Sequence, residues 1–251
     1  MSALRSERDG GILRITLARP ERRNAFDAAL IEELHEAFSD VGDARVIVLA
    51  GEGPSFCAGA DVDWMRSSVD YTHEENVADA VLLGRMLEAV DGCPAPVVAR
   101  IHGAALGGGS GLTACADVAI AAPSAQFGFT EVKLGIIPAI ISPFVLAKIG
   151  PGAARRFFVT GERFDAETAL RIGLVHEVRV DLDAAVERIT GEILSAGPAA
   201  TRAAKRLVHD CPALPRTAEL TAERRTSEEG QEGLLAFLDR RDPGWRSESF
   251  S

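Results

Sequence analysis

The chain has 251 residues, of which 47% are hydrophobic and 25% are charged, and its net charge is −10. This length suffices for one or two domains with a buried core. The acidic balance argues against a nucleic-acid partner, which needs clustered Lys and Arg. The chain has no apolar run of membrane-spanning length and no signal-peptide core, so we expect a cytoplasmic protein that is not embedded in a membrane.

The first half of the chain alternates expected strands with expected helices. Residues 11–18 alternate between apolar and polar, which predicts a half-buried strand. From Asp27, an N-cap residue, apolar side chains recur at helical spacing through Phe38. A capping box of Thr72 and Glu75 begins a second helix, whose apolar face is predicted at Val77, Ala80, Val81, Gly84 and Leu87.

Continuous apolar runs at 45–51, 93–103 and 116–122 predict strands buried on both faces. Strands that alternate with helices favour parallel pairing and an α/β fold. After about residue 196 we expect no strand. The pattern predicts three helices that Pro and Gly residues separate. We therefore predict a body over residues 1–195 and a helical region over residues 196–251.

Cysteines and metal motifs exclude several kinds of site. The four cysteines (Cys57, Cys93, Cys115 and Cys211) lie far apart and form no Cys-x-x-Cys pair, which excludes a zinc ribbon or a thioredoxin-type motif. Buried, reduced thiols are the expectation. No His-Glu-x-x-His motif or carboxylate cluster suggests a metal. We expect no metal and no separate cofactor.

Glycines cluster at 107–111, between an expected strand and an expected helix. One interpretation is close packing of the two elements. A second is a dinucleotide site, because residues 109–114 fit G-x-G-x-x-A, but the acidic residue that this motif requires is not placed at a neighbouring strand end. A third is an oxyanion hole, in which unpaired amides at this helix start and at residues 56–61 converge on one carbonyl oxygen.

Several motifs, in this order and spacing, resemble the crotonase (enoyl-CoA hydratase/isomerase) superfamily. They are SFCAGADVDWM, HGAALGGGSGL, ACADVAIAAPSAQFGFTEVKLGIIP and TGERFDAETALRIGLVHEV, and PERRNAFDAAL matches the family's N-terminal CoA loop. The resemblance covers about residues 10–240. It implies an α/β fold made of a ββα spiral with a C-terminal helical region for oligomerisation, and a homotrimer or a dimer of trimers.

The resemblance also implies site residues. The amides of Ala60 and Gly108 would form the oxyanion hole for the thioester carbonyl of an acyl-CoA, whose coenzyme A is part of the substrate. The residues that would contact the substrate or CoA are Arg23, Ala25, Ala58, Ala60, Asp61, Val62, Gly107, Gly108, Gly111, Phe237 and Arg240. Phe237 and Arg240 have two possible interpretations: they contact CoA in the pocket of a neighbouring subunit, or they belong to a solvated helix face.

The family's hydratases commonly use two glutamates, and this chain departs from that pattern. Glu131 stands at the second position, among mostly apolar neighbours that would raise its pKa, although a surface glutamate is the alternative. Gly111 stands at the first position. Ser110 and Thr130 are candidates to orient a water molecule, and His102 is expected to make a structural hydrogen bond.

Three functions remain open at this point. The segment EVKLGIIPAIISPFVLAKIG resembles the branch of methylglutaconyl-CoA-type hydratases, which predicts hydration of a 2-enoyl-CoA, with branched and glutaconyl acyl groups among the candidates. The alternatives are a Δ3-Δ2 enoyl-CoA isomerase that uses Glu131 alone and a non-catalytic acyl-CoA binder. We expect residues 64–90 and 136–145 to build the acyl pocket, with Lys133 or Arg85 as candidate partners for a substrate carboxylate.

Overall fold

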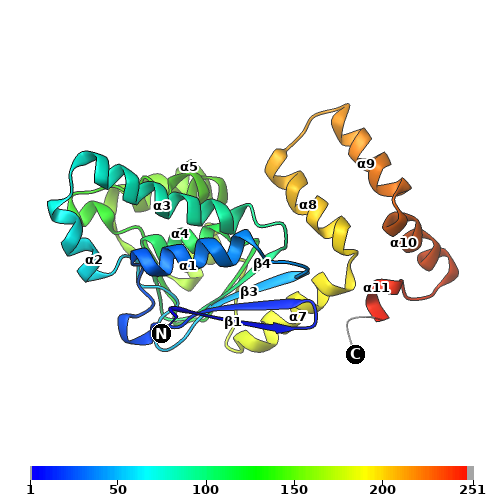
Figure 1. Cartoon of the computed structure of the whole chain (residues 1–251), viewed down its shortest axis with the longest axis horizontal. Coiled ribbons are helices and arrows are strands. Elements are labelled where there is room, and N and C mark those ends of the chain that lie inside the picture. The colour runs from blue at the N-terminus through cyan, green and yellow to red at the C-terminus, as the bar shows by residue number, and fades with distance from the viewer. Residues whose placement is uncertain (1, 248–251) are drawn as a thin grey trace.

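The computed structural model describes residues 2–247, which form two β-sheets, a set of covering helices and a C-terminal helical region (Figure 1). The strands are β1 (Leu4–Asp9), β2 (Ile12–Leu17), β3 (Val46–Gly51), β4 (Val97–Ile101), β5 (Ala104–Leu106), β6 (Val118–Ala121), β7 (Gln126–Gly128), β8 (Arg163–Asp165) and β9 (Glu177–Val178). The helices of the body are α1 (Ala28–Ser39), α2 (Val62–Ser67), α3 (His73–Asp91), α4 (Gly108–Cys115), α5 (Ser142–Thr160), α6 (Ala166–Arg171) and α7 (Leu182–Ser195). The C-terminal helices are α8 (Pro198–Asp210), α9 (Arg216–Thr226), α10 (Glu228–Asp239) and α11 (Gly244–Ser247), and the short 3-10 helices are η1 (Pro20–Arg22), η2 (Ser68–Asp70) and η3 (Glu131–Leu134).

The larger sheet has the strand order β1-β2-β3-β4-β6-β9. Its first pair is antiparallel and the other pairs are parallel, as the alternation of strands and helices predicts. The smaller sheet has the order β5-β7-β8, with β5 parallel to β7.

The chain visits the two sheets in successive turns of a spiral. Each turn adds a strand to the larger sheet (β3, β4 or β6), then a short segment to the smaller one, and then helices. The short segments are Cys57, β5 and β7, and Cys57 joins Ala105 of β5 through a parallel bridge. This is the expected ββα spiral. No sequence repeat reveals it, because the turns share backbone pairing rather than side chains.

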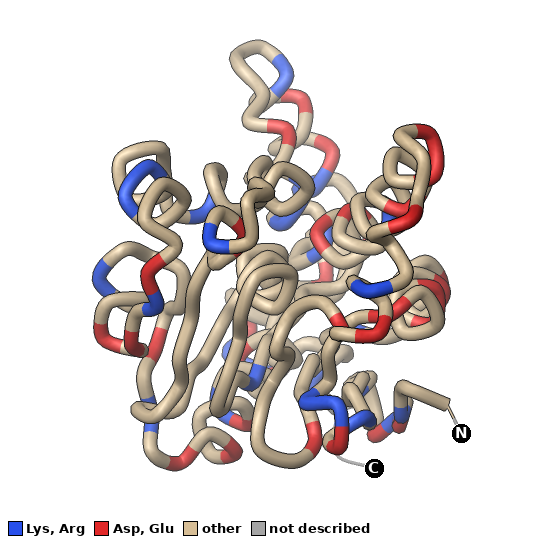
Figure 2. The backbone as a smooth tube through the Cα atoms, turned by 90° about the vertical axis from the view of Figure 1, so that its left-hand side faces the viewer, with Lys and Arg blue, Asp and Glu red and all other residues tan. Residues whose placement is uncertain are grey.

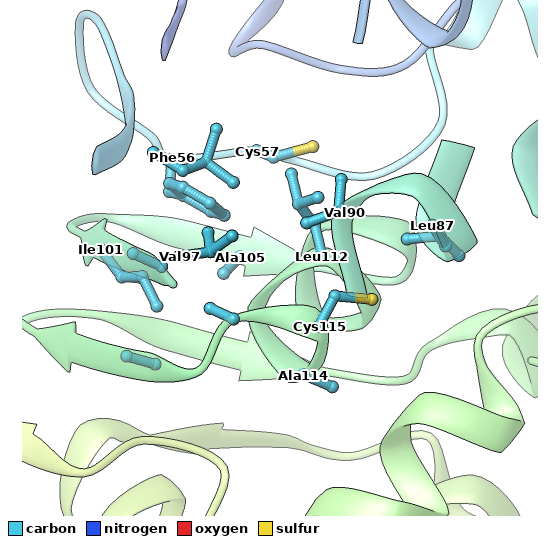
Figure 3. Close-up of a cluster of buried hydrophobic side chains, with 14 of the residues drawn as sticks. Phe56, Cys57, Leu87, Val90, Val97, Ile101, Ala105, Leu112, Ala114 and Cys115 are labelled. Carbon is cyan, nitrogen blue, oxygen red and sulfur yellow. The ribbon is translucent and has the colours of Figure 1, made fainter. Parts of the chain in front are cut away.

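The apolar runs of the central strands fill two hydrophobic clusters, one on each face of the larger sheet. Ile47 and Leu49 point into the cluster under α1 and α3, whereas Val46 and Val48 point into the cluster under α7. This alternation follows from the two-residue period of a strand. Figure 3 shows part of the first cluster, which gathers side chains from α3 (Leu87 and Val90), β4 (Val97) and α4 (Leu112 and Cys115).

The helix starts form largely as predicted, but the buried face of α3 matches the prediction only in part, at Leu87. The Asp27 carboxylate accepts from the Leu30 amide at 2.9 Å, and the capping box of Thr72 and Glu75 is present. The predicted residues Val77 and Val81 are exposed, and the residues that α3 buries are Met86, Leu87 and Val90. Only the C-terminal part of α3 lies over the core.

The predicted domain boundary falls between α7, which packs on β3, β4 and β6, and α8. From α8 onward the described chain is helical. Helices α8, α9 and α10 extend away from the sheets, so that α9 and α10 lie on the opposite side of the molecule from α2, and α11 returns to contact α7 (Figure 1). Acidic and basic residues are interspersed over the outer parts of the chain (Figure 2). In the part of the chain that the structure describes, no helix has the length and apolarity needed to cross a bilayer.

Candidate active site

A cavity of about 310 Å³ lies between the glycine loop, η3 and the helices α2 and α3. Its lining draws on both segments that the sequence indicates as the acyl pocket, 64–90 and 136–145. The lining residues are Phe26, Ala58, Gly59, Ala60, Trp64, Met65, Ser68, Asn76, Asp79, Leu83, Gly107, Gly108, Thr130, Glu131, Leu134, Ile136, Ile137, Pro138, Ala139, Ile140 and Ile141.

The register of the smaller sheet explains why distant segments meet here. Cys57 pairs with Ala105, and Ala105 pairs with Phe127, so these residues are level across three spiral turns. Three residues further along each turn come Ala60, Gly108 and Thr130, and Glu131 follows Thr130. All of these residues line the cavity. The parallel pairing therefore brings the two candidate amides and the candidate carboxylate to one edge.

The Ala60 amide is free because its neighbours make the backbone hydrogen bonds at this point. Ala60 bridges to Phe26, but the bonds of that bridge run from the Phe26 amide to the Gly59 carbonyl and from the Asp61 amide to the Phe26 carbonyl. In a parallel bridge the residue between the two bonded positions directs its own amide away from its partner. Within residues 2–247, no acceptor pairs with the Ala60 amide.

The Gly108 amide is free because it begins a helix. Gly107 has φ +50°, a backbone conformation that residues other than glycine rarely adopt, and its amide donates to the Gly128 carbonyl at 2.8 Å. The chain then turns into α4, whose first amides lack helical partners and carry the positive end of the helix dipole. No acceptor in the described chain takes the Gly108 hydrogen. Both amides are thus available to an oxygen atom in the cavity.

Glu131 places its carboxylate beside the glycine loop. Its Oε1 lies 3.3 Å from the position that a Cβ atom on Gly107 would occupy. Its Oε2 is buried and has no hydrogen-bond partner among the described residues. Burial raises the pKa of Glu131 above its usual value of 4.5. A carboxylate that lies at a cavity wall and has an unpartnered oxygen atom is suited to exchange protons with a ligand.

Gly111 does not reach the cavity. A Cβ atom at this position would lie 2.4 Å from Cγ2 of Ile141, which lines the cavity in its place. Gly109 is similarly close-packed, since a Cβ there would lie 2.3 Å from the Cys57 carbonyl oxygen. The packing interpretation of the cluster thus holds for Gly109 and Gly111, and these glycines lie beside Gly108, whose amide is free.

Of the residues predicted to contact CoA, Ala58 and Ala60 line the cavity, whereas Arg23, Ala25, Asp61 and Val62 lie around it. The Arg23 carbonyl accepts from the amide of Ala58, which does line the cavity. Ala25 is buried, and Val62 is exposed on α2. The Asp61 carboxylate is buried, lies 3.5 Å from Arg19 and caps α2, so this side chain serves the fold.

Phe237 and Arg240 do not approach this cavity. They lie at the end of α10, and Phe237 is exposed; α10 is on the far side of the body from α2 (Figure 1). Ser110 is fully buried and bonded to β5 and β7, so it does not face a ligand, whereas Thr130 does line the cavity. His102 makes the expected structural hydrogen bond, to the Gly53 carbonyl oxygen at 2.8 Å.

Several lining residues were not anticipated individually from the sequence, among them Phe26, Trp64, Asp79 and Ile141. The segments containing Trp64, Asp79 and Ile141 were indicated, but which side chains turn inward depends on how α2, α3 and η3 fold back together. Within residues 2–247, no group of three or more His, Cys, Asp or Glu residues is arranged to hold a metal ion.

Comparisons with known proteins agree with this architecture. The family model described as enoyl-CoA hydratase/isomerase matches residues 7–248. An enoyl-CoA hydratase structure from Shewanella pealeana is 40% identical, with 97% of this chain and 96% of that chain covered and a TM-score of 0.93. Pseudomonas aeruginosa AtuE is also 40% identical, with 97% and 99% covered and a TM-score of 0.92.

A curated relative from Rhodobacter capsulatus, named "Probable enoyl-CoA hydratase", is 37% identical over 253 residues, which is 96% of each chain. The match spans the body and the helical region alike, and it includes the loops that carry the free amides and Glu131. The fold is that of the crotonases, and the relatives are named as enzymes of the hydro-lyase class. The chain is therefore an enzyme of the enoyl-CoA hydratase/isomerase family.

Proposed function

We propose that this enzyme adds water across the C2=C3 bond of a 2-enoyl-CoA thioester. The observation that carries the proposal is the meeting, in one cavity, of two unpaired amides with a carboxylate whose buried Oε2 atom has no partner in the described chain. This combination matches what the reaction needs, namely donors for a developing oxyanion and one group that exchanges protons.

In the proposed reaction Glu131 acts first as a base and then as an acid. It accepts a proton from water while the water oxygen bonds to C3. The electrons of the C2=C3 bond move toward the thioester, whose oxygen becomes an enolate held by the amides of Ala60 and Gly108. The enolate then re-forms the carbonyl group as C2 takes the proton from Glu131, which returns to its ionised form. One water molecule is added in all.

The amides supply the largest electrostatic contribution. They are fixed by the bridge at Ala60 and by the start of α4 at Gly108, so no reorganisation is needed when negative charge develops on the thioester oxygen. Removing one such donor typically costs about 3 kcal/mol of transition-state stabilisation.

The rest of the proposal concerns CoA and assembly. Arg23 and its loop would hold the nucleotide end of CoA at the cavity entrance. The Ala58 amide, which donates to the Arg23 carbonyl, connects this loop to the cavity lining. We propose no cofactor apart from the CoA that the substrate carries. We also propose a trimer or a dimer of trimers, in which Phe237 and Arg240 would contact the CoA of a neighbouring subunit.

A second candidate reaction is Δ3-Δ2 isomerisation of an enoyl-CoA. The observation that favours it is the contact between Gly111 and Ile141, which leaves no space for a second carboxylate at the position where many hydratases have one. Glu131 alone would remove a proton from C2 and return it at C4, while the same amides hold the dienolate.

Product mass distinguishes the two reactions. The full chain is incubated with crotonyl-CoA and, separately, with 3-hexenoyl-CoA. Hydration adds the mass of one water and removes the absorbance of the enoyl thioester, whereas isomerisation leaves the mass unchanged. Glu131→Gln should lower kcat by about 100-fold or more, and Glu167→Gln, an exposed carboxylate on α6, should not. A folded enzyme that transforms no enoyl-CoA, or a fully active Glu131→Gln variant, would refute the proposal.

A further inference from the structure

The wall of the cavity formed by α2, η2 and α3 carries polar side chains that the proposed reaction does not use. Asn76, Asp79 and Leu83 follow each other at spacings of three and four residues, so they share one face of α3, and all three line the cavity. Ser68 of η2 and Trp64 of α2 stand on the same wall. This wall belongs to the segments that would surround the acyl chain.

The hydrogen-bond donors on this wall are already used within the protein. Trp64 donates its indole N–H to Asp79 Oδ1 at 3.2 Å. Asn76 donates to the carbonyls of Tyr71 and Thr72 at 3.1 and 2.9 Å, and Ser68 donates to the Met65 carbonyl at 2.8 Å. Oxygen acceptors therefore remain for a ligand, foremost Oδ2 of Asp79, which no described donor contacts.

The cavity also lacks a positive charge. Among its described lining residues there is no Lys, Arg or His, and the two that carry charge, Asp79 and Glu131, are both acidic. Lys133 and Arg85, which the sequence suggested as partners for a substrate carboxylate, are exposed and do not line it. Burial raises the pKa of Asp79, while the bond from Trp64 favours its ionised form.

We infer that Asp79 is a specificity residue that makes this site select uncharged acyl chains and reject acyl chains that end in a carboxylate. A terminal carboxylate would bring negative charge to Asp79 and acceptor oxygens to a wall that offers acceptors, so it would lose its hydration without gaining a partner. An alkyl chain meets the apolar remainder of the cavity instead, including Met65, Leu83 and Ile140. This inference rests on the proposed acyl-CoA site.

The test compares two saturated thioesters that have no C2=C3 bond to react. Pentanoyl-CoA and glutaryl-CoA each have five acyl carbons and differ in the terminal carboxylate. Calorimetric titration of the full chain should show pentanoyl-CoA binding at least about tenfold more tightly. Asp79→Asn keeps the size of the side chain and its bond from Trp64 but removes the charge. It should reduce the ratio of the two dissociation constants about fivefold, mainly by tightening the binding of glutaryl-CoA.

Glu74→Gln is the matched control. It removes one negative charge from the same helix at an exposed position outside the cavity, and should leave the ratio unchanged. Asp79→Ser is a second variant with a smaller neutral side chain, and should shift the ratio in the same direction as Asp79→Asn. Melting curves of each variant confirm that it is folded.

The outcomes separate this inference from the proposed function. Equal binding of the two thioesters, tighter binding of glutaryl-CoA, or a ratio unaffected by both Asp79 variants would overturn the role of Asp79 while leaving the enoyl-CoA reaction intact. If pentanoyl-CoA binds no more tightly than free CoA, and no enoyl-CoA is transformed, both the acyl site and the inference are wrong.

Discussion

Burial raises the pKa of Glu131, and the Oε2 atom of this residue has no partner within residues 2–247. A folded protein rarely keeps a buried acceptor unpaired, because the lost hydration is not replaced. The position is therefore expected to be less stable with a carboxylate than with a neutral side chain, and the catalytic role proposed for Glu131 would explain why a carboxylate is present.

The sign of this effect can be worked out. The folded-state pKa of Glu131 lies above its value of 4.5 in the unfolded chain. The stability linked to this proton is complete below pH 4.5 and is lost as the pH rises through the folded-state pKa. A Gln side chain has no charge to bury, so Glu131→Gln should melt higher than the wild type at neutral pH, by roughly 2 °C.

Differential scanning calorimetry at neutral pH and at mildly acidic pH measures this difference, which should shrink as the pH falls. Glu167→Gln, at an exposed site, should melt like the wild type at both pH values. A Glu131→Gln variant that is less stable than the wild type at neutral pH would contradict the prediction, and would indicate that the ionised carboxylate is stabilised by a contact.

Gly111 and Ile141 form a coupled pair. A Cβ at position 111 would lie 2.4 Å from Ile141 Cγ2, so Gly111→Ala should destabilise the protein by about 1–3 kcal/mol despite the better helix propensity of Ala. Ile141→Ala should cost about 2–5 kcal/mol, because Ile141 is buried. The double variant should be more stable than the sum of the two changes predicts, by about 0.5–3 kcal/mol. Urea unfolding of the four proteins measures this coupling, and strictly additive changes would show that the two side chains do not compete.

At the scale of the elements, the local features of the sequence predict local structure well. Asp27 and the pair Thr72–Glu75 mark helix starts because a cap depends on residues that are three apart in sequence. The apolar run at 45–51 predicts a strand buried on both faces, and the two hydrophobic clusters confirm this for residues 46–49. These signals depend on neighbours in the chain alone.

Other parts of the fold could not be predicted in this way. Strands β5, β7 and β8 have three residues each, too few to show a period, yet their register brings Ala60, Gly108 and Glu131 together. The family resemblance suggested these residues, but their meeting in one cavity depends on long-range pairing. The same holds for Asp79, whose inward direction follows from the way α3 extends past the core.

Ser110 connects the elements that hold the Gly108 amide. Its buried hydroxyl donates to the Ala105 carbonyl of β5 at 2.6 Å and accepts from the Gly128 amide of β7 at 3.2 Å. Ser110→Ala leaves these groups without that partner and should cost about 1–3 kcal/mol of stability. Because it also loosens the start of α4, we expect kcat to fall about tenfold or more while KM changes less.

Thr113→Val provides the comparison for this positioning role. Thr113 is also buried in α4, but its hydroxyl donates within the helix, to the Gly109 carbonyl at 2.9 Å. Thr113→Val should lose stability without the loss in kcat. Steady-state kinetics and melting curves on both variants decide the point, and equal losses of kcat would show that Ser110 acts through general stability alone.

At the scale of the whole molecule, the C-terminal region contacts the body through both α11, whose Trp245 donates to the Ser195 carbonyl at the end of α7, and α8. The Lys205 ammonium lies 2.7 Å from the Asp117 carboxylate, and Arg202 donates to the Ala44 carbonyl at 3.0 Å. Further along, α10 presents a set of exposed apolar side chains: Leu234, Leu235, Phe237 and Leu238. Neighbouring apolar residues of this kind, on a helix that extends from the body, typically mark a protein–protein interface.

If that interface joins copies of this chain, one charge on it should weaken the assembly. Phe237 is 81% exposed within the single chain, and Phe237→Glu would bury a carboxylate in an apolar contact, which is strongly unfavourable. By analytical ultracentrifugation we expect the wild type at about three or six times the chain mass of 26.6 kDa, and the variant at lower mass. Val180→Glu is the control. It changes a residue that lies before α7 and is 90% exposed, and it should leave the mass unchanged.

A wild type that sediments as a monomer, or an unaltered Phe237→Glu assembly, would show that α10 has another role. A further loss of CoA affinity in the dissociated variant would place Phe237 and Arg240 next to a neighbour's substrate, since neither approaches the cavity of its own chain.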